Sequence, residues 1–161
     1  MNQPIQDQAT SLESLTCRWR ALIGRECARV EYSVEARVIR EYADLFGYSS
    51  ARFHSRDAAV AEGYRSLVAP AAFGAVYTMH AVLAVLHDPI LDVPFAWNLH
   101  AGQLLNFGEP VCAGDLLTTI VTLQNVAPKP PNLFYALGTR TTNAEGAICA
   151  TGTSTHVVRV P

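Results

Sequence analysis

One stretch, from Ala71 to Leu86, limits what this chain can fold into more than any other segment. Its sixteen residues, AAFGAVYTMHAVLAVL, contain no Asp, Glu, Lys or Arg and no helix breaker other than Gly74. A helix that is apolar on nearly every side has to be buried on most of its faces. Pro89 prevents the helix from continuing, and the run is shorter than the roughly 20 residues that cross a bilayer. We therefore expect a central helix in a globular core.

The chain beyond this helix is typical of β-structure. Four stretches there alternate between apolar and polar positions or are rich in Thr, Val, Ile and aromatic residues, as half-buried strands are. Segments with Gly, Pro and Asn separate them and favour turns. We expect the last stretch, which contains His156, to lie at an edge or an interface. The expected strands are VPFAWNLHAGQLLNF, GDLLTTIVTLQNV, NLFYALGTRTTN and GAICATGTSTHVVRV.

Shorter elements precede the central helix. Apolar residues recur there at helical spacing, and a glycine follows each expected helix end. One strand, short helices, a buried helix and then four strands predict an α+β hot-dog fold, in which an antiparallel sheet wraps around a long central helix. The pattern alone also fits other α+β sheets that cover one face with a helix. The expected early elements are a helix over 15–23 before Gly24, a strand from Cys27, a helix over 38–46 before Gly47, and a helix over 57–62 before Gly63.

Length and composition predict one domain that associates with another. The 161 residues suit a single core. We place this core at residues 13–161, after a polar lead over residues 1–12 that we expect to be disordered. Half of the residues are hydrophobic and only 16% are charged, so part of the surface is expected to be covered in an oligomer.

Charge and cysteine spacing exclude several classes of partner. A net charge of −2 with a single lysine, Lys129, leaves no basic stripe for nucleic acid or an anionic membrane. The polar N-terminus, MNQPIQDQATSLES, does not resemble a signal peptide, so we expect a cytoplasmic protein without membrane spans. The four cysteines are far apart, without a CxxC pair or a histidine at ligand spacing. We therefore expect free thiols and no metal site.

Three segments between His54 and Arg159 resemble the MaoC-like dehydratase and hydratase family, in particular the branch related to the dehydratase domain of fungal-type fatty acid synthases. The first resembles the family's entry to the central helix, the second its His-Gly-Gly-Gln strand and following turn, and the third its last hairpin. In chain order they are HSRDAAVAEGYRSLVAP, LHAGQLLNFGEPVCAGDLL and TNAEGAICATGTSTHVVR.

The resemblance implies chemistry on an acyl thioester, carried by coenzyme A or acyl carrier protein, with no other cofactor. Family members add or remove water across the α,β bond. This reaction needs a base for the proton beside the carbonyl, an acid for the β-hydroxyl and a dipole for the enolate-like oxygen. The family takes the acid and the base from a Gly-Asp-x-Asn-Pro-x-His signature, and the dipole from backbone N–H groups where the central helix begins.

On that signature the chain reads GYSSARFH over residues 47–54. Tyr48 stands at the Asp position and Ser50 at the Asn position, and His54 matches the His. A tyrosine has an ordinary pKa near about 10 and is not a carboxylate at neutral pH. The candidate catalytic residues are therefore His54, with Tyr48 and Ser50 as polar substitutes, while His54 could also be a loop histidine with local hydrogen bonds. One inserted residue also allows an alignment with Phe53 at the His position, which leaves neither partner in place.

The resemblance also implies a substrate site and a partner. Pro70, Phe73 and Gly74, at the start of the central helix, are candidate substrate-binding residues for the thioester. His100, in the strand that resembles the His-Gly-Gly-Gln element, is a fourth candidate substrate-binding residue, although it could also be structural. The family builds its site between two hot-dog units, so we expect a homodimer or a heterodimer with a related subunit. In some heterodimers of the family one subunit holds the catalytic pair and the other shapes the acyl tunnel.

These features predict an acyl-thioester-binding subunit of a 3-hydroxyacyl-thioester dehydratase or enoyl hydratase in which the catalytic pair has degenerated. One alternative is a self-sufficient (R)-specific enoyl-CoA hydratase that uses His54 with another acid. Another is a hot-dog acyl-CoA thioesterase that uses Asp57 or Glu62 as its carboxylate.

Overall fold

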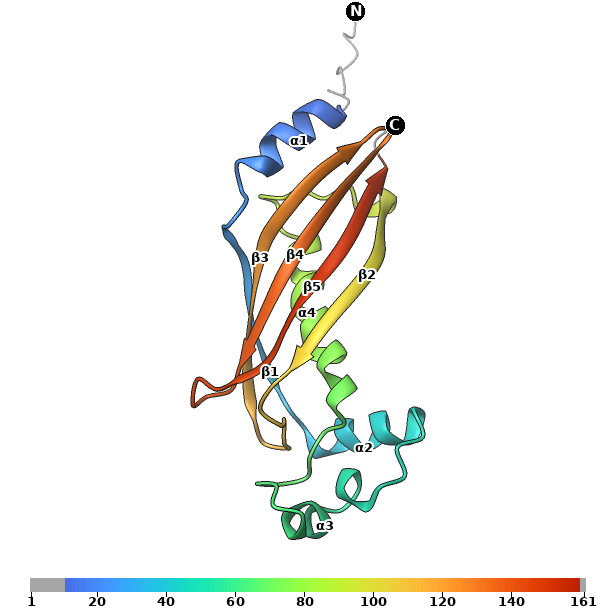
Figure 1. Cartoon of the computed structure of the whole chain (residues 1–161), viewed down its shortest axis with the longest axis vertical. Coiled ribbons are helices and arrows are strands. Elements are labelled where there is room, and N and C mark those ends of the chain that lie inside the picture. Colours follow the sequence, from blue (N-terminus) through green and yellow to red (C-terminus); the bar gives the residue numbers. More distant parts are fainter. Residues whose placement is uncertain (1–10, 160–161) are drawn as a thin grey trace, which may run out of the picture.

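A five-stranded antiparallel sheet forms the frame of the molecule (Figure 1). The computed structural model describes residues 11–159. Within this range the strands lie in the order β1-β3-β4-β5-β2, so β1 and β2 are the two edges. Their bounds are β1 Glu26–Ser33, β2 Asn98–Phe107, β3 Leu116–Lys129, β4 Asn132–Thr142 and β5 Ile148–Arg159.

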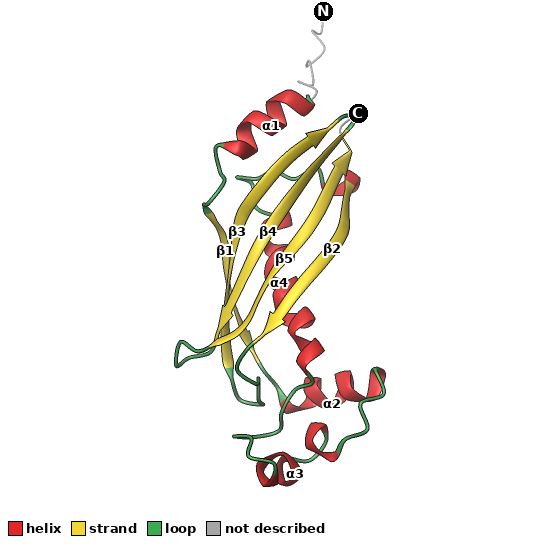
Figure 2. Cartoon of the chain, in the orientation of Figure 1, coloured by secondary structure: helices red, strands yellow, loops and turns green. Residues whose placement is uncertain are grey.

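The sheet curves around helix α4, Gly74–Leu86, as Figure 2 shows. A single 3-10 turn, Ala71–Phe73, leads into this helix, so the uncharged run forms the helical segment that the sequence predicts. Ala81, Val82 and Val85 are fully buried and pack against the inner face of the sheet. This arrangement is the hot-dog fold, and the predicted α+β class is confirmed. Within the described range no helix is both long and apolar enough to span a membrane.

Alternation along the strands directs one side of each strand to this helix. In β3 the residues at every second position from Leu117 to Leu123 are buried, and in β4 Leu133, Tyr135 and Leu137 are buried in the same way. A period of two is what a strand needs to cover a core with one face. The sequence pattern therefore sets the register of the sheet against α4.

Three further helices lie at the two ends of the sheet (Figure 1). They are α1 Leu12–Arg20, α2 Ala36–Leu45 and α3 Arg56–Ala61. Trp19 of α1 packs edge-on against Tyr135, with ring centroids 4.8 Å apart. Gly24, Gly47 and Gly63 have positive φ angles in the turns after these helices, which glycine adopts without strain. The prediction of a disordered lead falls mostly on residues 1–10, outside the described residues.

The strand expected from residue 93 starts later than the sequence pattern suggests. Residues Phe95–Trp97 form a 3-10 turn, closed by a bond from the Trp97 N–H to the Pro94 carbonyl at 2.9 Å. Strand β2 begins only at Asn98. Apolar residues alternated through this turn as they do in a strand, and the local turn hydrogen bond overrides that pattern.

His156 lies in an interior strand and not at an edge, because β5 is flanked by β4 and β2. Its side chain is 1% exposed and stacks on Tyr135 with ring centroids 5.1 Å apart. Its Nε2 atom lies 2.8 Å from the Ser154 hydroxyl. Burial, and to a lesser degree the neighbouring His100, lowers the pKa of His156 to about 4. The His156 imidazole is therefore neutral in the folded core near pH 7.

This burial makes the fold acid-sensitive. The folded-state pKa lies below the 6.5 of an ordinary histidine, so the stabilisation by neutral His156 is complete above about pH 6.5 and is lost as the pH falls towards 4. Between pH 7 and pH 4.5 the free energy of unfolding should fall by about 2 kcal/mol more in the wild type than in His156→Gln. Urea unfolding at both pH values measures the difference; equal losses would contradict this role of His156.

Candidate functional site

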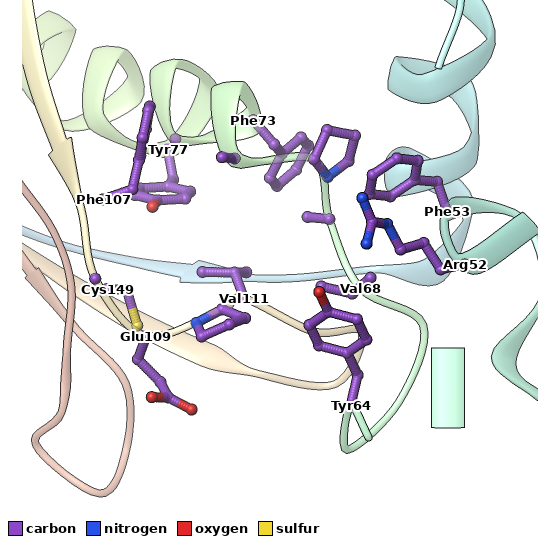
Figure 3. A pocket seen from close by; sticks show the side chains of 16 residues that line it. Arg52, Phe53, Tyr64, Val68, Phe73, Tyr77, Phe107, Glu109, Val111 and Cys149 are labelled. Carbon is purple, nitrogen blue, oxygen red and sulfur yellow. The ribbon is translucent and has the colours of Figure 1, made fainter. Parts of the chain in front are cut away.

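A cavity of about 210 Å³ opens beside the first turn of α4 (Figure 3). Three segments form most of its wall, and Tyr64, Tyr77 and Cys149 complete it. The loop between α2 and α3 contributes Arg52 and Phe53, the chain approaching α4 contributes residues 68–71, 73 and 74, and the end of β2 with its following turn contributes residues 107–111. The cavity therefore lies where the central helix begins, at the end of the core that the short helices cover.

The three residues predicted to receive a thioester all line this cavity. Pro70, Phe73 and Gly74 stand together at the junction of the 3-10 turn and α4. A Cβ atom at position 74 would lie only 2.8 Å from Cε1 of Phe107, so glycine allows the Phe107 ring to approach the start of the helix. The N–H groups of Phe73 and Gly74 already donate to the carbonyls of Pro70 and Ala71, so the N–H that has no acceptor within this turn and favours an oxygen ligand is at its start, at Ala71. This end of the cavity can thus receive a carbonyl oxygen.

Most of the wall is neutral. Burial raises the pKa of Tyr77 and, with a smaller effect from the Asp115 carboxylate, that of Cys149, so the phenol and the thiol stay protonated near pH 7. The exposed Glu109 supplies the one carboxylate among the described lining residues, and it lies across the cavity from Arg52 (Figure 3). No histidine belongs to the described lining.

Arg52 is the cationic group of the wall. Its Nη1 atom donates to Glu62 Oε2 at 3.1 Å, and its guanidinium carbon lies 4.9 Å from the centroid of the Phe53 ring. Its Nε atom is buried and has no hydrogen-bond partner. The sequence prediction missed Arg52. One alignment puts Phe53 at the position of the catalytic histidine. The residue directly before it, Arg52, could therefore have been predicted to lie near the site.

Tyr48 and Ser50 do not line the cavity. Tyr48 is half-buried and packs edge-on against Phe53, with ring centroids 5.6 Å apart. Both rings belong to a small apolar cluster with Ala43 and Val68. Ser50 is exposed. The structure thus brings an aromatic pair together at the place where the family signature has a carboxylate and an imidazole.

His54 does not line the cavity either. Its Nε2–H donates to the backbone carbonyl of Tyr48 at 2.7 Å, and its own carbonyl accepts from Arg40 Nε at 3.0 Å. Its Nδ1 atom is 3.6 Å from Asp44 Oδ1, at a surface where the Asp44 side chain is 74% exposed. A carboxylate thus stands near the ring, but outside the cavity. These contacts hold the loop after α2 in place.

His100 also lies apart from the cavity, on edge strand β2, with its ring centroid 5.2 Å from that of His156. The structure therefore unites Pro70, Phe73 and Gly74 at one site and separates them from His54 and His100. Among residues 11–159 no three His, Cys, Asp or Glu side chains gather in a way that could hold a metal ion.

Sequence comparison identifies relatives over most of the chain. Residues 21–151 match the family described as FAS1-like, dehydratase domain region. A relative from Saccharopolyspora erythraea, named UPF0336 protein, is 31% identical over 141 residues, which cover 87% of this chain and 90% of that protein.

Two solved structures have a similar fold. One is the C-terminally truncated HadBC (3R-hydroxyacyl-ACP dehydratase) complex from Mycobacterium tuberculosis, with a TM-score of 0.71, 24% identity and coverage of 81% of this chain and 93% of that chain. The other is a MaoC-like dehydratase from Rhodospirillum rubrum, with a TM-score of 0.69, 22% identity and coverage of 86% and 93%. The chain belongs to the family described as FAS1-like, dehydratase domain region, and it shares the fold of these two structures.

Proposed function

We propose that this chain is an acyl-thioester-binding subunit of a 3-hydroxyacyl-thioester dehydratase or enoyl hydratase, and that a related hot-dog subunit supplies the catalytic Asp and His. The composition of the cavity wall carries this proposal. Phe53 and Arg52 stand on the wall, and His54 is bound to the Tyr48 carbonyl outside it.

Hydration requires a base and an acid that reach the same substrate atoms. A candidate base has to lie within hydrogen-bond reach of the proton that it removes, about 2.6–3.2 Å. Glu109 is the one carboxylate of the described lining, and no imidazole shares the cavity with it. The cavity can therefore hold an acyl group, but it offers no matched pair for proton transfer.

The two edges of the sheet support association through β2. Edge strands are normally protected from pairing by charged side chains. Strand β1 carries Glu26, Arg29 and Glu31, whereas the ten residues of β2 carry no Asp, Glu, Lys or Arg. Leu99 and Leu104 of β2 are 67% and 62% exposed. An antiparallel partner strand would cover this edge. HadBC, the structure of similar fold from Mycobacterium tuberculosis, is a 3R-hydroxyacyl-ACP dehydratase complex.

The purified full-length chain should hydrate crotonyl-CoA no faster than buffer, because its cavity lacks the acid and base pair. Loss of enoyl absorbance measures this rate. Addition of a hot-dog subunit with an intact Asp and His should give rapid hydration. Rapid turnover by the chain alone that disappears in His54→Ala would support a self-sufficient hydratase instead, and release of free thiol from acyl-CoA would support a thioesterase.

His54 should matter for stability. His54→Ala should lower the free energy of unfolding by about 1 kcal/mol, because the Tyr48 carbonyl loses its donor. Asp44→Asn is the matched control and should change it by less than about 0.5 kcal/mol, since the carboxylate is exposed. Urea unfolding compares the stability of the two variants. The hydration rate of the two-subunit complex should be the same with either variant as with the wild-type chain. A fall in that rate in His54→Ala alone would contradict a structural role.

Strand β2 should be the pairing edge. Leu104→Lys should weaken association about tenfold or more, because an ammonium group would have to be desolvated in the strand pair. Val60→Lys, at an exposed position of α3, is the control and should leave association unchanged. Analytical ultracentrifugation of both variants provides the measurement. Unchanged association of Leu104→Lys would place the interface elsewhere.

A further inference from the structure

One flank of helix α1 forms an open groove on the surface of the molecule. The groove measures about 520 Å³ and lies between α1 and Pro128 of strand β3. Figure 1 shows α1 at the end of the sheet opposite to α2 and α3. The match to the dehydratase family begins at residue 21, so α1 lies outside the matched region. The residues of α1 that line the groove are Leu12, Glu13, Thr16, Cys17 and Arg20.

Other contacts hold α1 in place. Trp19 is fully buried and donates from Nε1 to the Leu91 carbonyl at 2.7 Å. Arg18 donates from Nη2 to the same carbonyl at 3.1 Å, and its Nη1 atom lies 3.4 Å from the Asp92 carboxylate. A helix that is fixed in this way loses little freedom when its remaining flank meets a partner. The flank that lines the groove is therefore a preorganised surface.

Two side chains of opposite charge stand at the ends of this flank. Glu13 and Arg20 are seven positions apart, which is about two turns of a helix, so both lie on the same face. In the described part of the chain neither of them forms an ion pair. Thr16 and Cys17, between them, are small enough to let another helix approach closely. The flank thus presents a negative end, a small centre and a positive end.

A second copy of the same flank has the complementary order when it lies antiparallel. Positions 13 and 20, and likewise 16 and 17, are equally distant from a point midway between residues 16 and 17. A two-fold axis at this point therefore sets Glu13 of each copy against Arg20 of the other, and Thr16 against Cys17. All four charges then meet a charge of opposite sign. A partner of a single charge sign would match only one end of the flank.

We propose that two copies of this chain associate through antiparallel α1 helices that meet in this groove. The contact is separate from the β2 edge, and it does not depend on a bound acyl thioester. A helix of nine residues is only about 14 Å long, so the interface is small and the association is weak. Together with pairing at β2, this contact joins two-subunit units into a larger assembly.

Disulfide trapping detects a weak contact of this kind. Cys17 is the one exposed cysteine among residues 11–159. In the proposed pair the two Cys17 side chains lie beside the two-fold axis, within reach of a disulfide. Mild oxidation of the full-length chain with copper phenanthroline should convert most of it into a covalent dimer on a non-reducing gel. The matched control, Cys17→Ser/Ser14→Cys, moves the thiol to an exposed position outside the groove and should give little covalent dimer.

Exchange of the two charges tests the antiparallel arrangement. Glu13→Arg or Arg20→Glu alone puts like charges together at both ends of the pair and should weaken association roughly tenfold. The double variant Glu13→Arg/Arg20→Glu restores opposite charges and should restore association. Each change also opposes the helix macrodipole, so a loss of helix stability alone would be largest in the double variant. Sedimentation in the Leu104→Lys background, where pairing through β2 is weakened, compares the variants with the unexchanged chain.

Two results would overturn this proposal. One is a double variant that associates no better than the single variants, and the other is equal trapping of the wild-type chain and Cys17→Ser/Ser14→Cys. Thermal unfolding of each variant verifies that it is folded. No thioester is present in either experiment, so the outcome is independent of the proposed acyl-thioester binding.

Discussion

The burial of helix α4 by the curved sheet is the constraint on which the rest of the structure depends. An uncharged helix of thirteen residues gains stability only if apolar surface covers it on most sides, and the inner faces of the five strands supply that surface. Once the helix is enclosed, its first turn can meet a ligand only from the open end of the sheet. There the α2–α3 loop and the end of β2 close around it and leave the cavity.

The same loop decides what this cavity can do. Its tight 3-10 turn, Ala51–Phe53, directs Arg52 and Phe53 to the cavity, while the next residue, His54, bonds back to the loop's own backbone. The directions of these adjacent side chains thus decide that a guanidinium and a phenyl ring, and not an imidazole, line the cavity. The uncharged edge strand β2 on the same unit favours association with a partner strand.

Much of this arrangement could be predicted from sequence periodicity. The run from Ala71 to Leu86 could only be a buried helix, and the alternation in β3 and β4 determined which side chains face it. The start of the central helix follows from the sequence, and the family resemblance implied that positions 70, 73 and 74 at this start belong to the substrate site. The side-chain directions in the α2–α3 loop could not be predicted in this way, because neither periodicity nor spacing shows which of residues 52, 53 and 54 faces the cavity. The interior position of His156 depends on strand order, which short-range patterns do not specify.

Exchange of the C2 protons of a bound acyl thioester tests most directly whether the cavity lacks a base. Butyryl-CoA incubated with the full-length chain in deuterium oxide would incorporate deuterium at C2 if any group removed the proton beside the carbonyl, whether or not water were later added or lost. We expect mass spectrometry to show exchange no faster than in buffer. Rapid, saturable incorporation of deuterium would contradict the view that this subunit holds its ligand without a proton-transfer pair.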